Sequence, residues 1–213
     1  MMIQYLKETK IGVIIFLSLL LFNACCFKKP NETARYALSE KELNLIPYEI
    51  NDVVYFEHSG GYLFEFEVVE DLIEWRKYTE FCEWNCCGQD YFSYETKKTT
   101  LISFYPKFEI HLLLGENHFD YTPNTLTIDI NSRHYFIMNY DSLAEIQIID
   151  NMILHDSLIL NDVVFKNVIE KPIEYLTYTN DSIELMPQSI LYNQFGLLQI
   201  KMNNDETFTI SNP

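Results

Sequence analysis

Hydrophobic and polar residues alternate with a period of two along most of the chain after residue 51. Apolar side chains occupy every second position of four stretches: Tyr62–Val68, Phe108–Leu112, Leu126–Ile130 and Leu198–Met202. This alternation is typical of β-strands that bury one face and leave the other in water. The pattern therefore predicts a mainly β protein with wet outer faces on its strands.

Turn-forming residues separate these stretches at short intervals. They are Ser59–Gly61, Gly115–Asn117, Asn131–Ser132, Asn180–Asp181 and Asn203–Asp205. Strands joined by such short connections are expected to form antiparallel meanders. Because each strand is apolar on one side only, we expect a curved sheet or an open barrel with the aromatic residues inside.

A helix signal stands before the first strand. Ser39 is followed three residues later by Glu42, which is the form of a capping box, and Pro47 closes the segment. We predict one helix of about two turns there. A second segment, residues 72–81, fits either another helix or the continuation of a strand.

Composition supports the β prediction and restricts the partners. The chain has six glycines but thirty tyrosines and phenylalanines, which favours strands over disorder. Its formal net charge is −16, and such a surface is repelled by the phosphates of nucleic acid. We therefore predict no nucleic acid partner.

The N-terminal segment has the organisation of a signal peptide. Lys7 and Lys10 precede an apolar run from Ile11 to Phe22 that is interrupted only by Gly12 and Ser18. A membrane-spanning helix needs about 20 apolar residues, so this run is too short for a good one. It fits the central region of a cleaved signal peptide covering residues 1–24, the alternative being an N-terminal membrane anchor.

Cys25 is the predicted site of lipid attachment. The small Ala24 directly before it resembles the lipobox at which lipoprotein signal peptidase cuts, although Phe22 and Asn23 depart from the usual residues. Cys26 is adjacent and is the alternative site. Stable anchoring needs about two acyl chains, which a diacylglyceryl group on Cys25 supplies. The membrane is thus a predicted partner, through the N-terminal lipid.

The predicted domain organisation follows from this cleavage. Residues 1–24 are the signal peptide, 25–36 a lipidated tether, and 37–213 a single β-rich domain. Removing Lys7, Lys10 and Glu8 leaves a mature chain of charge −17. We expect a cell-envelope location on the periplasmic face of the outer membrane, because Phe27–Lys29 lacks the acidic run that resembles a surface-export signal.

Three cysteines remain in the body of the chain. Cys82, Cys86 and Cys87 lie close together, and export would place them in an oxidising compartment. A local disulfide from Cys82 to either Cys86 or Cys87 is favoured over free thiols and over a metal site. Zinc sites usually carry a second, distant cysteine or histidine pair, which this chain does not have.

Four segments resemble uncharacterised lipoproteins of Bacteroidota, of the flavobacterial type. Ser39–Tyr48 is similar to their "S-x-K-x-L-x-x-I-P-Y" opening, and Leu160–Val168 to a later strand. Ser189–Ile200 resembles their "V-Y-Y-S-K-x-x-G-I-I-x-F" segment, and Asp205–Ile210 resembles the strand after it. The resemblance implies no activity, because none is established for that family.

The third of these segments, Ser189–Ile200, also predicts a local structure. Gly196 lies between two apolar alternations, so we expect it in a hairpin with a positive φ. Leu191 and Phe195 are expected on the core side.

Three Asp-Ser-aliphatic tripeptides resemble the sequon at which Bacteroidota O-glycosylate exported proteins. They place candidate O-glycosylation sites at Ser142, Ser157 and Ser182. The alternative is that Asp-Ser is simply a common turn pair before a strand.

The remaining polar residues give no catalytic signature. The five histidines have no i, i+2 or i, i+4 partner, and the chain has no G-x-S-x-G elbow. The acidic residues Glu65, Glu67, Glu70, Asp71 and Glu74 are interpreted as a wet sheet face and a charged edge rather than a calcium site. We predict no catalytic residues, no metal and no cofactor, and we do not expect an enzyme.

These observations favour a membrane-anchored envelope lipoprotein with a non-catalytic binding domain. Its partner would be an envelope protein or a glycan. The alternative is a carrier or sensor that holds an apolar, lipid-like ligand in the cavity of a curved sheet. The sequence leaves the oligomeric state open.

Overall fold

The computed structural model describes residues 29–79, 89–115, 125–131, 133–140, 146–147, 151–173 and 186–211. Within these ranges the protein is mainly β, with 69% of the described residues in strands and very little helix, as the alternation predicts. The elements have the following bounds: β1 Glu32–Tyr36, α2 Glu40–Leu43, β2 Val53–His58, β3 Leu63–Thr79, β4 Tyr91–Phe104, β5 Lys107–Leu114, β6 Thr125–Ile130, β7 Arg133–Tyr140, β8 Ile146–Gln147, β9 Ile153–Leu160, β10 Val163–Pro172, β11 Pro187–Asn193, β12 Gly196–Met202 and β13 Thr207–Ile210.

The strands form one sheet in the order β8-β7-β6-β5-β4-β3-β2-β13-β12-β11-β10-β9, and β1 pairs with β4 in parallel. Nearly all neighbours in this order are also neighbours in the chain, so the predicted antiparallel meander is confirmed. The exception is the pairing of β13 with β2, which brings the C-terminal strand back beside the first long hairpin. Over the described strands the sheet is not closed into a barrel.

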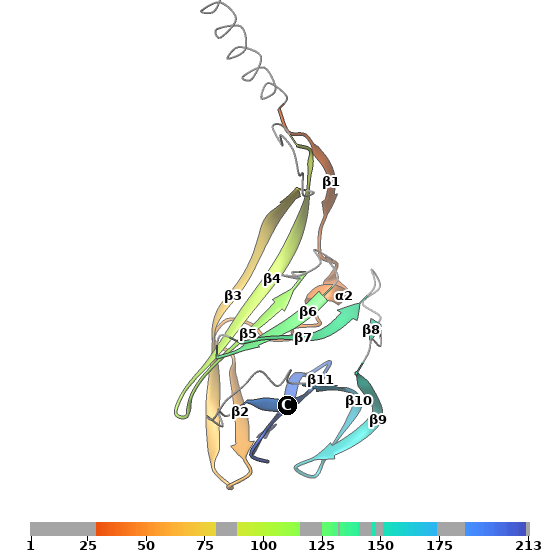
Figure 1. Ribbon diagram of the computed structural model, residues 1–213. Helices are drawn as coiled ribbons and strands as arrows, with labels where there is room; N and C mark the ends of the chain where they lie inside the picture. The colour runs from red at the N-terminus through yellow and green to blue at the C-terminus, as the bar shows by residue number, and fades with distance from the viewer. Residues whose placement is uncertain are drawn as a thin grey trace, which may run out of the picture. The chain divides into compact units, whose positions relative to one another are not determined.

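Within residues 37–75 and 95–213 the sheet curves so that one face encloses the core (Figure 1). The rings of Phe108 on β5 and Phe208 on β13 lie 5.6 Å apart, although three strands separate these two in the sheet. Phe66 on β3 packs edge-on against Phe108 at 5.9 Å. The predicted core faces of Phe108–Leu112, Leu126–Ile130 and Leu198–Met202 are buried as expected.

Two sites differ in burial from the expectation, one on an outer face and one on a core face. Thr125 and Thr127 alternate with the core residues of β6, yet both are fully buried rather than solvated. Tyr62 precedes β3 in the apolar phase of its stretch but is 45% exposed. Its ring stacks on the imidazole of His58 at 4.3 Å, so it closes the end of the hairpin instead of entering the core.

The helix is shorter than predicted. The capping box is present, since Ser39 accepts a hydrogen bond from the backbone of Glu42 and Glu42 accepts one from the backbone of Ser39. However, α2 spans one turn instead of two. Residues 72–79 continue β3, which resolves the ambiguity over this segment in favour of a strand.

The segment after α2 is fixed to the sheet by side chains from distant strands. The buried Lys97 amine on β4 donates to the carbonyl of Ile46 at 3.0 Å and forms an ion pair with Asp71 at 3.4 Å. The hydroxyl of Tyr192 donates to the carbonyl of Leu45 at 2.6 Å. These bonds satisfy carbonyl groups that a longer helix would have used internally.

Tyr48 completes this attachment. Its buried hydroxyl accepts a hydrogen bond from the Leu197 amide at 2.8 Å, and burial raises its pKa far above that of an ordinary tyrosine. Gly196, at φ +89°, lies directly beside this ring, and a Cβ there would come within 2.2 Å of the hydroxyl oxygen. The predicted positive φ of Gly196 is therefore confirmed, with a close approach as a second reason for glycine.

The chain divides into two compact units. One contains residues up to Tyr36 together with Arg76–Tyr94, and the other contains Ala37–Trp75 and Glu95–Pro213. The core described above belongs to the second unit. No helix within the described ranges is long and apolar enough to cross a membrane.

Candidate functional site

A surface hollow of about 380 Å³ opens beside the β4–β5 turn on the second unit. It is formed by β2, β3 and that turn. We call it the aromatic groove, and its lining residues are Tyr55, Leu63, Phe64, Glu65, Ser103, Phe104 and Tyr105. A volume of this size is within the range of sites that bind small ligands.

Large apolar side chains around the groove are unusually exposed. Phe104 is 79% exposed and Tyr105 is 87% exposed at the turn, while Leu63 is 62% and Tyr55 is 44% exposed. The strand period explains the last two, because Phe56 and Phe64 occupy the core face and leave their neighbours outside. Several exposed apolar groups around one hollow indicate a binding surface more strongly than scattered ones do.

The polar groups of the groove carry negative charge. Glu65 lies directly opposite Tyr55 in the β2–β3 pairing, and Glu57 and Glu67 lie on the same outer face one pair further along in each direction. Tyrosine and serine hydroxyls can donate and accept hydrogen bonds, whereas the carboxylates only accept them. This set suits a neutral ligand rich in hydroxyl groups, or a cationic one, and it disfavours an anionic ligand.

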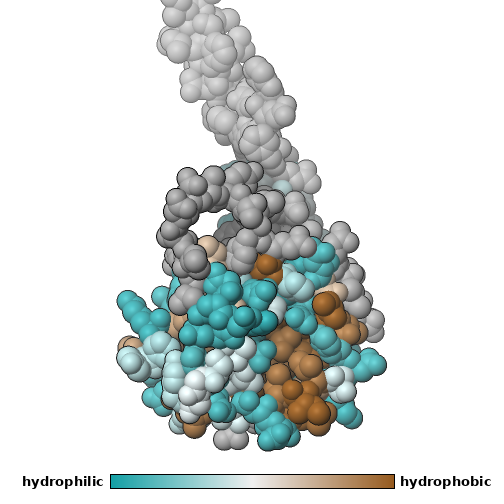
Figure 2. All heavy atoms as spheres, turned by 60° about the horizontal axis from the view of Figure 1, so that its bottom comes forward, coloured by the Kyte–Doolittle hydropathy of each residue, from teal (hydrophilic) through white to brown (hydrophobic). Residues whose placement is uncertain are grey.

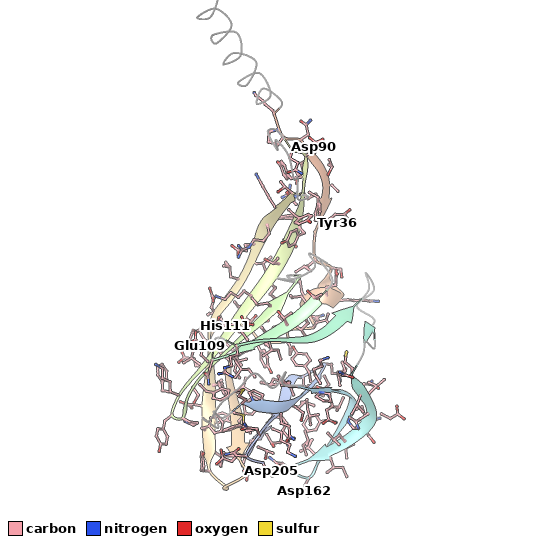
Figure 3. All side chains as sticks on the ribbon, viewed as in Figure 1. Tyr36, Asp90, Glu109, His111, Asp162 and Asp205 are labelled. Atoms are coloured by element: carbon pink, nitrogen blue, oxygen red, sulfur yellow. The ribbon has the colours of Figure 1, made fainter. Side chains whose placement is uncertain are left out.

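A chain of polar contacts crosses the outer face of β3, β4 and β5. The hydroxyl of Thr100 lies 2.7 Å from a carboxylate oxygen of Glu70 and 2.9 Å from Nδ1 of His111. Glu109 lies 3.2 Å from the other ring nitrogen of His111, and both residues are marked on β5 in Figure 3. Lys98 completes the chain through an ion pair with Glu70 at 2.7 Å.

This polar chain is interpreted as structural. Thr100 is only 4% exposed, so its hydroxyl cannot reach a substrate as a nucleophile. The hydrogen bonds from Lys98 and Thr100 hold the pKa of Glu70 below its ordinary value. Among the described residues no group of three or more His, Cys, Asp or Glu side chains is placed to hold a metal ion.

The acidic run has two different environments. Glu65 and Glu67 are exposed on the outer face of β3, as interpreted from the sequence. Asp71 instead accepts a hydrogen bond from Thr99 at 2.8 Å and pairs with Lys97. The run therefore supplies one residue to the groove and others to cross-strand ion pairs.

Of the modification sites predicted from sequence, one lies in the described part of the chain. Ser157 is exposed in the middle of β9, opposite Lys166 of β10, rather than in a turn. Cys25, Cys82, Cys86, Cys87, Ser142 and Ser182 lie outside the described residues. The structure therefore does not test the lipidation, disulfide and glycosylation predictions at those positions.

A second apolar surface lies on β9 and β10. Figure 2 shows hydrophobic side chains gathered on the side where these strands lie in Figure 1. The exposed members are Ile153, Leu154, Ile159, Val163 and Val164. Asn161 and Asp162 form the two-residue turn between these strands, both with positive φ. The aromatic groove combines exposed apolar side chains with a hollow, so it is the better candidate.

Phe195 departs from its prediction and lies outside the core. It is 45% exposed at the β11–β12 turn, whereas Leu191 is buried as expected. Phe195 lines a smaller hollow of about 260 Å³ with Pro47 and Val53. The turn residue lies beyond the last paired positions, Asn193 and Gly196, and so the strand alternation no longer sets its direction.

The inner face of the curved sheet is filled by its own side chains at the positions described. Phe56 packs against Phe66 with ring centroids 5.3 Å apart, and Phe64 lies 5.6 Å from Phe208. Such close ring packing is typical of a solid core. A ligand carried inside the sheet would have to displace these rings, which favours recognition on the outside.

No family model matches the chain, and neither the curated proteins nor the solved structures contain a significant match. The resemblance to Bacteroidota lipoproteins therefore stays a prediction. Function is inferred from the groove and from the chemistry of its lining.

Proposed function

We propose that this protein is a lipid-anchored protein of the bacterial cell envelope that binds neutral glycans through the aromatic groove. The anchoring half of the proposal is supported by the sequence alone, through the signal peptide of residues 1–24 and the lipobox at Cys25. The binding half is supported by the exposed aromatic residues around the groove.

The chemistry of a sugar ring matches this lining. One face of a pyranose ring presents C–H groups that pack on an aromatic ring, and its edge presents hydroxyl groups. Phe104, Tyr105 and Tyr55 supply exposed rings, while Glu65 supplies a carboxylate acceptor within the same hollow. Aromatic residues give much contact area for little loss of conformational freedom, which suits them to this role.

The charge of the surroundings selects among glycans. Glu57, Glu65 and Glu67 share the outer face of β2 and β3, so sulfated or uronic-acid polymers would be repelled. Neutral and amino sugars would not. The ligand class is therefore a neutral or N-acetylated oligosaccharide.

The test is calorimetric titration of the Cys25→Ser mature chain with oligomers of glucose and of N-acetylglucosamine. We expect binding to at least one series and a loss of tenfold or more in Phe104→Ser and in Tyr105→Ser. Phe195→Ser is the matched control, because it removes an exposed aromatic residue from a different turn. Loss of binding in the control alone would move the site to the smaller hollow, and binding unaffected by all three would refute the proposal.

A further inference from the structure

β9 forms one end of the sheet in the second unit. It pairs with β10 on one side, and none of the described strands pairs with its other side (Figure 1). Asn161 and Asp162 join it to β10 in a two-residue turn, where Figure 3 marks Asp162. Among the described residues, the free side of β9 is therefore an open sheet edge that can accept another extended strand.

The register of the hairpin shows which backbone groups of β9 point outward. Leu160 and Val163 flank the turn as a pair, and the residues that flank such a turn exchange backbone hydrogen bonds. Bonded and non-bonded pairs alternate along antiparallel strands, so Ser157 and Lys166 form a non-bonded pair. In agreement, the carbonyl of Lys166 accepts a hydrogen bond from Asn193 on β11, its other neighbour. The N–H and C=O groups of Ser157 therefore point away from β10.

The residues of β9 do little to protect this edge. Sheet edges in natural proteins are often blocked by Lys, Pro or a bulge. The eight residues of β9 include no Lys, Arg, Pro or Gly, and Asp156 is the one carboxylate among them. Ile153, Leu154 and Ile159 are 46%, 48% and 68% exposed. A strand with an open edge and an apolar surface suits pairing with a second apolar strand.

The sequence of β9 is complementary to itself when two copies run antiparallel. With a two-fold axis at Ser157, the opposed residues are Ser157 with Ser157, Asp156 with Leu158, His155 with Ile159 and Leu154 with Leu160. No like charges then face each other, and the outward backbone groups of Ser157 bond those of its copy. An axis at Asp156 would instead oppose two carboxylates, which is destabilising.

We propose that β9 pairs with β9 of a second copy of this chain, in a symmetric antiparallel dimer centred on Ser157. Both copies use the same edge, so the contact closes at two copies and does not continue into a fibre. A contact of eight residues from each copy is small, which makes the association weak and concentration-dependent. It needs neither the proposed lipid nor the aromatic groove.

The test is sedimentation equilibrium of the Cys25→Ser mature chain at concentrations up to about 1 mM, in the range of weak association. Salt of about 0.15 M limits repulsion between the acidic copies to a Debye length of about 8 Å. We expect a monomer–dimer equilibrium. A non-reducing gel excludes a disulfide between copies as its cause.

Two substitutions of Ser157 separate the edge from the side chain. Ser157→Pro removes the amide that the second copy would bind, and we expect the dimer to weaken tenfold or more. The folded monomer loses no hydrogen bond, because this amide faces away from β10 and proline is tolerated at such edge positions. Ser157→Ala keeps the amide, so it is the matched control and should dimerise as the parent does.

A second pair of variants tests the register. In Ser157→Lys two lysines face each other across the axis, and the dimer should weaken at least threefold although the chain becomes less acidic. Val164→Lys is the matched control. Val164 lies opposite Ile159 on β10 and is 60% exposed, but it is one strand away from the edge. Lysine there should leave the dimer unchanged.

Three results would overturn the proposal: a parent chain that stays monomeric up to about 1 mM, a dimer of Ser157→Pro as strong as that of the parent, or assembly beyond two copies. Thermal unfolding followed by circular dichroism checks that each variant is folded. If Ser157→Pro does not fold, Ser157→Lys and Val164→Lys decide the question, and equal dimerisation of these two would refute the pairing at Ser157.

Discussion

The close approach of Gly196 to Tyr48 gives a stability prediction with a matched control. Gly196 has φ +89° and Gly61 has φ +82°, so alanine at either position takes a similarly unfavourable backbone conformation. The surroundings differ. A Cβ on Gly61 meets nothing within 4 Å, whereas a Cβ on Gly196 would come within 2.2 Å of the Tyr48 hydroxyl oxygen.

The expected costs follow from this difference. Gly61→Ala should lose about 1–2 kcal/mol of unfolding free energy, the strain of a left-handed alanine. Gly196→Ala carries the same strain and also displaces the buried Tyr48 ring, which leaves the Leu197 amide without its acceptor. An unsatisfied buried donor costs about 1–3 kcal/mol, so the total should be about 2–5 kcal/mol.

Urea unfolding and thermal unfolding of the Cys25→Ser mature chain, both followed by circular dichroism, measure the two variants. In a protein of this size 1 kcal/mol shifts Tm by about 2–4 °C, so Gly196→Ala should melt about 10 °C below the parent. The near-ultraviolet signal of the buried tyrosines should change in that variant only. Equal losses in the two variants would show that the contact with Tyr48 is not a constraint, and the reasoning would fail.

Three further predictions concern charge and anchoring. Lys97→Met should cost about 2–3 kcal/mol in urea unfolding, because it leaves the partly buried Asp71 unpaired, and a cost near zero would contradict the attachment described above. Lys98→Met should raise the pKa of Glu70 towards its ordinary value in an NMR titration. A carboxyl group whose pKa is lowered by folding stabilises the fold at pH values above its unfolded pKa. This contribution is lost as the pH falls through the folded pKa, so the Lys98→Met variant should lose less stability in acid than the parent. Cys25→Ser should abolish fatty acid labelling of the full-length chain. Equal labelling of the variant and the parent would place the anchor at Cys26, and no label in either chain would mean that there is no lipid anchor.

The core faces of the strands could be predicted because each depends only on the alternation of apolar and polar residues within that strand. Successive side chains of a strand point to opposite faces of the sheet. Phe108, Ile110 and Leu112 are therefore predicted to share one face without knowledge of the partner strand. The same holds for the capping box, which needs only the four residues from Ser39 to Glu42. The end of α2 could not be predicted in this way, because Lys97 and Tyr192, far along the chain, bind the carbonyls that follow it.

The alternation of residues does not predict the aromatic groove, for a different reason. Phe104 and Tyr105 lie where β4 turns into β5, and the alternation of a strand gives no direction to residues in a turn. A usable signal was present, since two large aromatic residues directly before Pro106 occupy a turn that has no core face. The pairing of β13 with β2 left no local signal at all, because it joins segments about 150 residues apart.

The salt dependence of glycan binding tests whether the groove acts through ring packing or through charge. Raising the salt concentration from about 0.1 M to about 1 M shortens the Debye length from about 10 Å to about 3 Å. Binding of a neutral oligosaccharide to the groove should change little, since ring packing and hydrogen bonds carry it. If the affinity for an oligomer of glucose or N-acetylglucosamine fell steeply with salt, charge would dominate the contact, which would contradict a site built on ring packing and hydrogen bonds.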